Sequence, residues 1–462
     1  MITDSKKNQI KENILQTIGN TPLVKLNKIT KGYKPQILVK VEFFNPGSSV
    51  KDRIGFEIIE EAERDGRLRS GGTIVEATSG NTGVALALAA AVKGYKCIFT
   101  MPDKMSSEKI MLLRAFGAEV IITPTAVPHE SPESYTEVAK RIVRETPNSI
   151  LANQFFNPKN PEAHYKTTGP EIWEQTGGKV NYFIDGAGTG GTISGVGKFL
   201  KEKNPGVKII IADPKGSILR EFHQTKKIPD TFSPYKVEGI GSDWIPGALH
   251  IEYVDEIIEV TDRESFLMAR RLTREEGIFV GGSSGTNLAA ALKLAERLSE
   301  EDVVVVLLPD TGERYLSKIY NDIWMRENGF LIPEKITMRD VLLGKAKTLS
   351  QLISIDPSAT IQHALDLFKK YDISQLPVID KGKPVGSVND NELMSAVLEK
   401  SSLLDKPVSQ IMADTFPIIG VEAPIEHAVE LLTKKHSAVL IEEKKKIIGI
   451  VTRYDVIEYM SR

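Results

Sequence analysis

Short apolar runs alternate with helix-like stretches from about Asn20 to Asn328, and glycine-rich segments lie at several of the junctions. Apolar strands that are separated by amphipathic helices are typical of parallel sheets covered on both faces, so this region is expected to form an α/β fold. The expected strands are Thr73–Ala77, Lys96–Thr100, Glu119–Thr123, Tyr182–Asp185, Lys208–Asp213 and Val303–Leu308. The expected helices are Val84–Val92, Glu108–Phe116, Tyr135–Glu145, Gly195–Glu202, Arg263–Glu276 and Asn287–Leu298.

Two of the glycine-rich segments follow an expected strand and open an expected helix. Thr78–Gly83 follows Thr73–Ala77, and Gly186–Thr192 follows Tyr182–Asp185. In open α/β sheets, ligands bind in the crevice at the carboxyl ends of the strands. Two such loops therefore predict two α/β lobes with a ligand between them.

Length and composition limit the classes of protein that fit. The chain has 462 residues, which corresponds to roughly three units at about 150 residues per domain. Its residues are 41% hydrophobic and 26% charged, which is ordinary for globular domains. The formal net charge of -2 gives no broad basic field, so nucleic acid is not an expected partner.

Cys97 is the single cysteine of the chain, so an internal disulfide and a cysteine-rich metal site are both excluded. It lies in an apolar run, and we expect a buried strand residue rather than a reactive thiol. The segment Met1–Gln9 lacks the apolar core of a signal peptide, and no run of 18 apolar residues exists. A cytoplasmic protein with no membrane partner is expected.

The chain changes character near residues 329–335 and then repeats itself. Ile361–Leu367 returns as Ile425–Leu431, and Gly386–Asn389 returns as Gly449–Thr452. Two copies of about 60 residues, each helix–strand–strand–helix, fit a closed tandem pair better than an open stack, which needs three or more repeats. The expected divisions are a first domain over 1–330, a linker over 331–336, and repeats over 337–398 and 399–462.

Lys51, in the segment Ser48–Arg53, carries an amine that can condense with an aldehyde. Alone it would be read as one solvated lysine among many. The downstream segments Thr78–Gly83, Gly188–Thr192 and Gly281–Gly285 supply hydrogen-bond donors and a glycine cradle. Together these features provide what pyridoxal 5′-phosphate (PLP) needs.

The cradle suits the doubly charged phosphate of PLP. Gly188, Gly190 and Gly191 let the main chain approach closely, and Thr189 and Thr192 add hydroxyl donors. The N–H groups at the start of the following helix favour an anion. A loop of this kind taken alone is also compatible with a tight turn that binds nothing.

Polar residues in the other loops allow two interpretations each. Asn81 is either an N-cap or turn residue or a donor to the 3′ oxygen of the cofactor ring, while Ser79 and Thr82 can bind a substrate carboxylate. Ser283, in a turn before a helix expected from about Thr286, is either an N-cap or the partner of the ring nitrogen. A neutral hydroxyl partner leaves a weaker electron sink than an aspartate, which favours β-elimination and β-replacement over transamination.

Residues from about Gln9 to Asn328 resemble the fold-type II PLP enzymes of the cysteine synthase and cystathionine β-synthase family. The motifs that carry the resemblance are Thr17–Leu23, Ser49–Arg53, Thr78–Gly83, Gly188–Thr192, Gly239–Gly241, Gly281–Gly285 and Leu308–Tyr315. The resemblance implies a two-lobed enzyme in which Lys51 forms the Schiff base, Asn81 meets the 3′ oxygen, Gly188 to Thr192 hold the phosphate and Ser283 meets the ring nitrogen. It further implies that the amino-acid carboxylate is held by Thr78, Ser79, Thr82 and Gln154.

The implied reaction is replacement of the β-hydroxyl of serine by a thiol, through the Lys51 aldimine and an aminoacrylate, with Lys51 as general base. Serine plus homocysteine, giving cystathionine and water, is the preferred pair, with Glu238, Gly239 and Phe43 on its side. Phe155 and Ser242 stand against it, because family members that make cystathionine have tyrosine there. The alternatives are a cysteine synthase, using O-acetylserine or serine with sulfide, and a non-catalytic adenosyl-nucleotide-sensing scaffold; formation of hydrogen sulfide or cysteine is also compatible.

Haem is not expected. The resemblance implies that haem-bearing members have a long N-terminal extension with cysteine and histidine ligands. The residues before Thr17 contain neither cysteine nor histidine.

The repeat pair, from about Thr337 to Arg462, resembles a tandem CBS-domain (Bateman) module. The motifs are Leu376–Ile379, Gly386–Val388 and Gly449–Asp455. The resemblance implies an adenosyl ligand, with Asp455 accepting hydrogen bonds from ribose hydroxyls and Thr452 adding a polar contact; the first copy has Asn389 and Glu392 instead. S-adenosylmethionine is the first expected ligand and an adenine nucleotide the second, while a dimerisation module without ligand is the alternative. A homodimer or homotetramer is expected.

Overall fold

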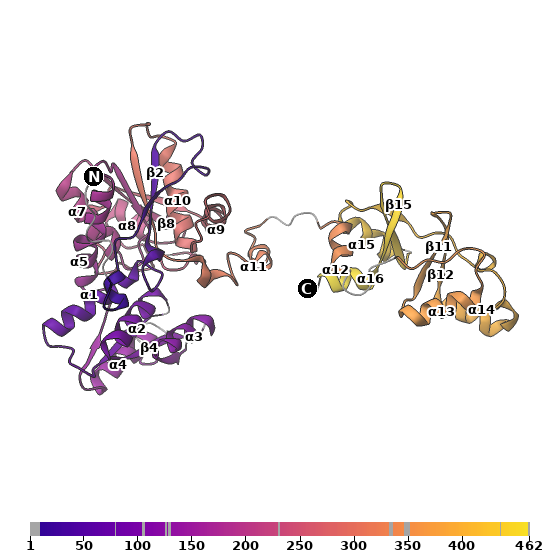
Figure 1. Cartoon of the computed structure of the whole chain (residues 1–462), viewed down its shortest axis with the longest axis horizontal. Helices are drawn as coiled ribbons and strands as arrows, with labels where there is room; N and C mark the ends of the chain where they lie inside the picture. The colour runs from indigo at the N-terminus through magenta and orange to yellow at the C-terminus, as the bar shows by residue number, and fades with distance from the viewer. Residues whose placement is uncertain are drawn as a thin grey trace. The chain divides into compact units, whose positions relative to one another are not determined.

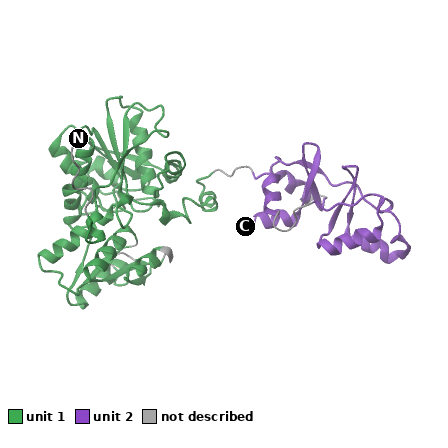
Figure 2. Cartoon of the chain, viewed as in Figure 1, with its two compact units in different colours: residues 1–331 green, residues 332–462 purple. Residues whose placement is uncertain are grey.

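The computed structural model describes residues 10–78, 80–103, 107–124, 127, 131–229, 232–331, 336–345, 352–434 and 436–460. The chain divides into two compact units, residues 1–331 and residues 332–462 (Figure 2). Each unit is described by itself.

A six-stranded sheet forms the larger part of the first unit (Figure 1). Its strands, in spatial order, are β1 (Leu23–Lys25), β2 (Gln36–Val41), β10 (Val303–Leu308), β7 (Tyr182–Asp185), β8 (Lys208–Pro214) and β9 (Glu256–Val260). All neighbours are parallel except β1 and β2. Val304 and Val306 join one hydrophobic core while Val305 and Leu307 join another, so both faces of β10 are buried. This is why the strand is a continuous apolar run.

A second, four-stranded sheet is parallel throughout. Its spatial order is β5 (Glu119–Thr123), β4 (Lys96–Pro102), β3 (Thr73–Ala77) and β6 (Ser149–Leu151). The helices α2 (Asn81–Lys93), α3 (Ser107–Ala115) and α4 (Tyr135–Glu145) accompany it in the lower part of Figure 1. Two parallel-sheet lobes confirm the expected α/β class.

The remaining helices of the first unit connect and cover the sheets. They are α1 (Lys51–Arg64), α5 (Lys159–Lys166), α6 (Thr168–Gln175), α7 (Gly191–Lys203), α8 (Leu219–Thr225), α9 (Asp262–Arg271), α10 (Gly282–Ala295) and α11 (Asp322–Glu327). Short 3-10 helices lie at η1 (Ile14–Thr17), η2 (Glu42–Phe44), η3 (Ile251–Tyr253) and η5 (Gly312–Tyr315). The single helix predicted over Arg263–Glu276 is α9 followed by a π-helical turn, η4 (Leu272–Glu276).

The second unit contains two helix–strand–strand–helix repeats, as the internal repetition predicted. The first is α13 (Ile361–Tyr371), β11 (Gln375–Asp380), β12 (Lys383–Asn389) and α14 (Asp390–Glu399). The second is α15 (Ile425–Lys434), β14 (Ala438–Glu443), β15 (Lys446–Thr452) and α16 (Arg453–Met460). Additional elements are α12 (Met338–Lys345), η6 (Ser401–Leu403), η7 (Val408–Gln410) and β13 (Ile418–Gly420), which pairs in parallel with β14.

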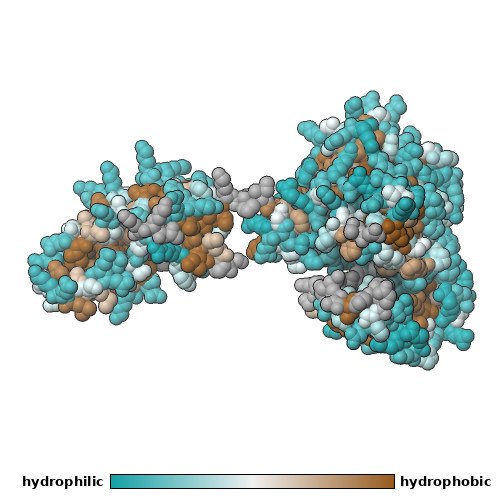
Figure 3. All heavy atoms as spheres, turned by 180° about the vertical axis from the view of Figure 1, so that it is seen from behind, coloured by the Kyte–Doolittle hydropathy of each residue, from teal (hydrophilic) through white to brown (hydrophobic). Residues whose placement is uncertain are grey.

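The surface seen in Figure 3 is mainly hydrophilic, with scattered hydrophobic areas on both units. On α16 the side chains of Tyr454, Ile457 and Met460 are exposed. Cys97 is buried in β4, as expected, and burial raises the pKa of its thiol to about 12. No helix in the described part of the chain is long and apolar enough to cross a bilayer.

Candidate functional site

A cleft of about 760 Å³ lies in the first unit and is lined by both glycine loops. The loop after β3 contributes Thr78 and Asn81, and the loop after β7 contributes Gly188 and Thr189. Lys51 lines the same cleft. The volume lies in the range of about 300–1,000 Å³ that is usual for cofactor and ligand sites.

Lys51 is the first residue of α1, directly after a turn that is tied to the end of β10. The N–H of Val50 donates to the carbonyl of Pro309 at 2.8 Å, and Ser49 forms a β-bridge with Asp310. Burial lowers the pKa of the Lys51 amine, while the carboxylates of Asp185, Asp310 and Glu42 act in the opposite direction. The net direction is downward, which makes a neutral amine more accessible.

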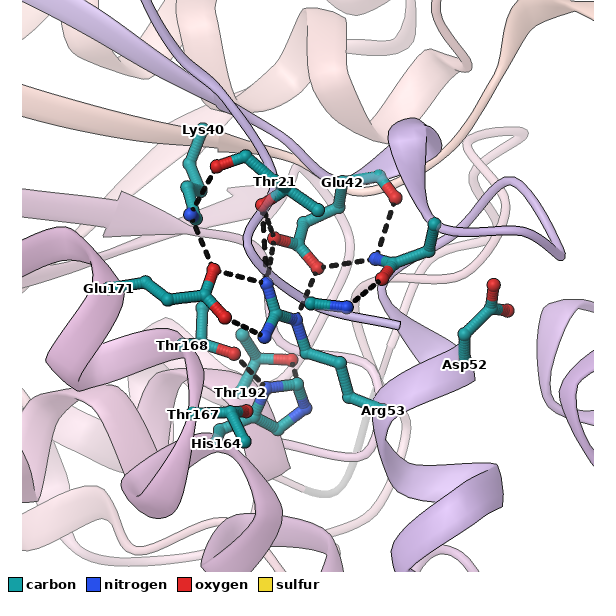
Figure 4. Close-up of polar contacts among 12 residues, drawn as sticks. Thr21, Lys40, Glu42, Asp52, Arg53, His164, Thr167, Thr168, Glu171 and Thr192 are labelled. Atoms are coloured by element: carbon teal, nitrogen blue, oxygen red, sulfur yellow. Dashed lines mark hydrogen bonds and ion pairs between the residues drawn. The ribbon is translucent and has the colours of Figure 1, made fainter. Parts of the chain in front are cut away.

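A buried network of charges holds the start of α1 (Figure 4). The Arg53 guanidinium donates to Glu42 through Nε at 2.7 Å and to Glu171 through Nη1 at 2.7 Å. Lys40, which is fully buried, donates to Glu171 Oε2 at 2.7 Å. Burial favours the neutral acid in Glu42 and Glu171, but the cations hold the pKa of both carboxyls below the ordinary value. The network joins β2, η2, α1 and α6 next to Lys51.

The glycine loop leaves no room for side chains. A Cβ added at Gly188 would lie 2.2 Å from the carbonyl oxygen of Gly239, and one at Gly191 would lie 1.8 Å from Asn160 Oδ1. Gly190 has φ +80° and precedes α7, whose first turn has no acidic residue and no side-chain cap. The Gly191 N–H donates to Thr189 Oγ1 at 3.4 Å, and the following N–H groups of this turn are available to an anion, so the loop fits a phosphate group.

Neighbouring side chains hold the hydroxyls of the glycine loop in place. Asn160 Nδ2 donates to Thr189 Oγ1 at 2.9 Å. The His164 ring lies between Thr168 Oγ1, 2.9 Å from Nδ1, and Thr192 Oγ1, 3.2 Å from Nε2. Burial and the charges of Arg53 and Lys51 keep the pKa of His164 well below its usual value, so this histidine is neutral. Gly191 is the one predicted loop residue that does not itself line the cleft.

Asn81 is the first residue of α2 and does not cap it; the N-cap is Gly80. Its Nδ2 donates to Asp310 Oδ2 at 2.8 Å, and its Oδ1 accepts from Arg314 Nη1. This arrangement fixes the orientation of the amide and leaves one of its N–H groups for a ligand.

Ser283 lies inside the first turn of α10 rather than in a turn before it, because the helix begins at Gly282. Its side chain lines the cleft, and no hydrogen bond to it is found among the described residues. The N-cap is Gly281, so the N-cap interpretation of Ser283 is wrong.

Three of the residues predicted to hold the substrate carboxylate line the cleft. These are Thr78, Thr82 and Gln154, and Thr82 Oγ1 donates to Gln154 Oε1 at 2.6 Å. Ser79 lies outside the described residues. The backbone of Gln154 is held by Glu76, a buried carboxylate on β3 that accepts its N–H at 3.2 Å.

Glu238 and Gly239 also line the cleft. The Glu238 carboxylate accepts from Lys318 at 2.5 Å and from Lys109 on α3. Burial works against the charge of Glu238, but the two lysines hold its pKa below the ordinary value. The two lysines were not anticipated from the sequence, since a pairing between residues so far apart is set only by the tertiary fold.

Part of the cleft wall is aromatic. The rings of Phe155 and Trp244 lie 5.2 Å apart, and both residues line the cleft. Ser242 Oγ donates to the carbonyl of Trp244 at 2.5 Å. The hydroxyl of Ser242 is therefore engaged by the backbone and does not replace the tyrosine hydroxyl that the family resemblance implies at this position.

In the second unit, Thr452 and Asp455 lie together at the junction of β15 and α16. Thr452 Oγ1 donates to Asp455 Oδ2 at 2.7 Å, and Lys345 Nζ donates to the same oxygen at 2.9 Å. In the first repeat, the Glu392 N–H donates to Asn389 Oδ1, so Asn389 caps α14. Only the second repeat has a buried carboxylate at this place among the described residues.

Comparison with known proteins decides the family. A model of pyridoxal-phosphate dependent enzymes matches residues 14–310, and a CBS-domain model matches residues 346–399 and 408–462. Cystathionine β-synthase from Dictyostelium discoideum is 42% identical over 99% of this chain and 93% of the relative. The chain belongs to the cystathionine β-synthase family. The same enzyme from Oryctolagus cuniculus is 41% identical over 99% of this chain and 86% of its own length.

Membership of the cystathionine β-synthase family makes the chain a PLP-dependent enzyme with a tandem CBS module. The crystal structure of a cysteine synthase from Entamoeba histolytica resembles it with a TM-score of 0.63 at 43% identity. That similarity covers 68% of this chain and 92% of the cysteine synthase. The cysteine synthase likeness is therefore partial, whereas the cystathionine β-synthases align over nearly the full length.

Proposed function

We propose that the first unit replaces the β-hydroxyl of serine with the thiol of homocysteine, giving cystathionine and water. The observation that carries the proposal is the cleft, in which Lys51 lies among the glycine loop, Asn81 and Ser283. The alignment with cystathionine β-synthases over nearly the whole chain supports the choice of substrates.

Each group of the cofactor has a counterpart in the cleft. Lys51 would hold the aldehyde carbon, Gly188 to Thr192 the phosphate, Asn81 the 3′ oxygen and Ser283 the ring nitrogen. When bound, PLP withdraws electrons from the amino-acid substrate, which allows a proton to leave Cα and the hydroxyl to leave Cβ. The neutral hydroxyl of Ser283 adds no charge to the ring nitrogen.

The residues around the cofactor position the substrate and move its proton. Thr78, Ser79, Thr82 and Gln154 would bind the carboxylate, and the hydrogen bond between Thr82 and Gln154 orients both side chains. The Lys51 amine takes the proton from Cα and later returns it, which its lowered pKa favours. Glu238 and Gly239 face the second substrate, beside the cations Lys109 and Lys318.

A second candidate, cysteine synthesis from O-acetylserine or serine and sulfide, is supported by the wall of Phe155 and Trp244 near Ser242. Phe155 and Trp244 carry no hydroxyl, and the Ser242 hydroxyl is engaged by the backbone. Products are identified after incubation with serine or O-acetylserine, each crossed with homocysteine or sulfide. Cystathionine from serine and homocysteine as the fastest product supports the proposal, and cysteine as the fastest product replaces it with the second candidate.

We further propose that the CBS module binds S-adenosylmethionine, or otherwise AMP or ATP, at Thr452 and Asp455, and that the enzyme works as a homodimer or homotetramer. A ligand can control activity only if it binds two states of the enzyme with different affinity. Calorimetry with each ligand on the full chain and on Asp455→Asn tests the site. Equal heats of binding for the unchanged protein and for Asp455→Asn would show that the ligand binds elsewhere.

A further inference from the structure

Asp185 is a buried carboxylate in the cleft. From the sequence alone, it has no expected role beyond that of the last residue of a strand. It is the last residue of β7 and directly precedes the glycine loop. The residue is 2% exposed, and it lines the same cleft as Lys51. Such a group at the carboxyl end of a central strand lies where chemistry takes place in α/β folds.

The side chain is held through one oxygen only. Asp185 Oδ1 accepts from the N–H of Gly186 at 2.9 Å and from Asn287 Nδ2 at 3.0 Å. Asn287 Nδ2 also donates to the carbonyl of Leu307 at 2.8 Å, and Asn287 lies one turn after Ser283 on α10. Among the described residues no hydrogen bond reaches Oδ2, so this oxygen is left for a group in the cleft.

Lys51 is the cation that acts most strongly on Asp185, and Asp185 is the carboxylate that acts most strongly on Lys51. Two other carboxylates, Asp310 and Glu42, act on Lys51 less strongly. Glu42 is paired with Arg53 at 2.7 Å. Asp310 accepts through Oδ2 from Tyr315 at 2.7 Å and from Asn81, and among the described residues its buried Oδ1 has no hydrogen-bond partner. Burial raises the pKa of Asp185 to about 7, so above that pH the carboxylate is ionised and can stabilise a positive charge on Lys51.

We propose that Asp185 is a positioning residue that stabilises the ammonium form of Lys51 inside the cleft and thereby sets the pH above which the amine can take the Cα proton. This inference deepens the proposed function, since it rests on Lys51 as the base. It adds an ionisable group to a cleft in which the neutral hydroxyl of Ser283 would meet the ring nitrogen.

The test measures the Lys51 amine without requiring turnover. The full-length protein is stripped of cofactor with hydroxylamine and labelled with acetic anhydride across pH, and the Lys51 peptide is quantified by mass spectrometry. For Asp185→Asn we expect the labelling midpoint about one pH unit lower, and so about tenfold faster labelling below the midpoint. Asp185→Ser, which is smaller and also uncharged, must give the same shift.

Asp213→Asn is the matched control, because Asp213 is a buried aspartate on the next strand, β8, and does not line the cleft. An equal midpoint in wild type and Asp185→Asn would overturn the inference, as would an equal shift in Asp213→Asn. In the loaded enzyme, the pH midpoint of the visible cofactor band and the acidic limb of kcat, which reports the enzyme–substrate complex, should move with the labelling midpoint. A labelling shift without a shift of that limb would support the charge coupling while contradicting Lys51 as the base.

Discussion

Replacing Lys40 with methionine tests whether the buried network beneath Lys51 stabilises the first unit. The Lys40 ammonium donates to Glu171 at 2.7 Å, to the Thr21 carbonyl at 2.7 Å and to Gln175 Oε1 at 2.9 Å. Breaking a buried pair by removing one partner costs about 3–5 kcal/mol. Glu171 keeps its bonds from Arg53 and from the N–H of Asn20, and methionine fills most of the space. We therefore expect a loss near the lower end, about 3 kcal/mol.

The assay is urea unfolding followed by tryptophan fluorescence. Trp173, Trp244 and Trp324 are the three tryptophans of the chain, and all lie in the first unit, so the signal reports on that unit. The control is Lys140→Met, which removes an exposed i,i+3 pair with Glu137 and should cost less than about 0.5 kcal/mol. A Lys40→Met variant as stable as that control would refute the reasoning.

Three further predictions concern the cleft and its surroundings. Gly191→Ala should reduce cofactor retention at least tenfold, because its Cβ would lie 1.8 Å from Asn160 Oδ1; PLP content after dialysis measures this, and full retention would contradict the close fit. Glu238→Gln should raise the KM for the thiol substrate about tenfold with less effect on the KM for serine, measured by steady-state kinetics; equal changes would place Glu238 at both substrates. Burial raises the pKa of Asp213 to about 7. Between about pH 4 and 7 the Asp213 carboxyl keeps its proton in the folded state and has lost it in the unfolded state, so the free energy of unfolding falls as pH rises through that window. Asparagine has no proton to lose, so Asp213→Asn should raise the free energy of unfolding by about 2–4 kcal/mol at pH 8 and by much less at pH 5. An equal change in the free energy of unfolding on Asp213→Asn at pH 5 and at pH 8 would contradict this.

The sequence predicted six strands of the first unit, including β3 with Glu76 and β5 with Glu119, and it missed β1, β2, β6 and β9. β1 and β6 have three residues each. β2 contains Lys40, and β9 begins with Glu256. A lysine within an apolar run indicates a surface position, and only the tertiary fold brings Glu171 to neutralise it. An ion pair between residues far apart in the chain leaves no pattern in the sequence around either residue, so it cannot be predicted from that sequence.

The cleft residues were found through motifs and not through periodicity. Lys51, Asn81 and Ser283 belong to segments that the family resemblance connects, and the structure brings them to one cleft. Lys109, Lys318 and Arg314 were missed because each acts through a partner far away in the chain. The start of α10 was placed too late, because the glycines of Gly281–Gly285 were taken as a turn, yet Gly282 already belongs to the helix.

The pairing of β2 with β10 joins Gln36–Val41 to Val303–Leu308. During synthesis, the ribosome must complete more than half of the protein after β2 emerges before its central neighbour exists. Until then β2 has an open apolar edge, and the turn that leads to Lys51 has no Pro309 carbonyl to accept from Val50. Long-range parallel pairing of this kind is slow and exposed to aggregation. The nascent chain therefore gains its reactive amine early but can hold it in place only near the end of translation of the first unit.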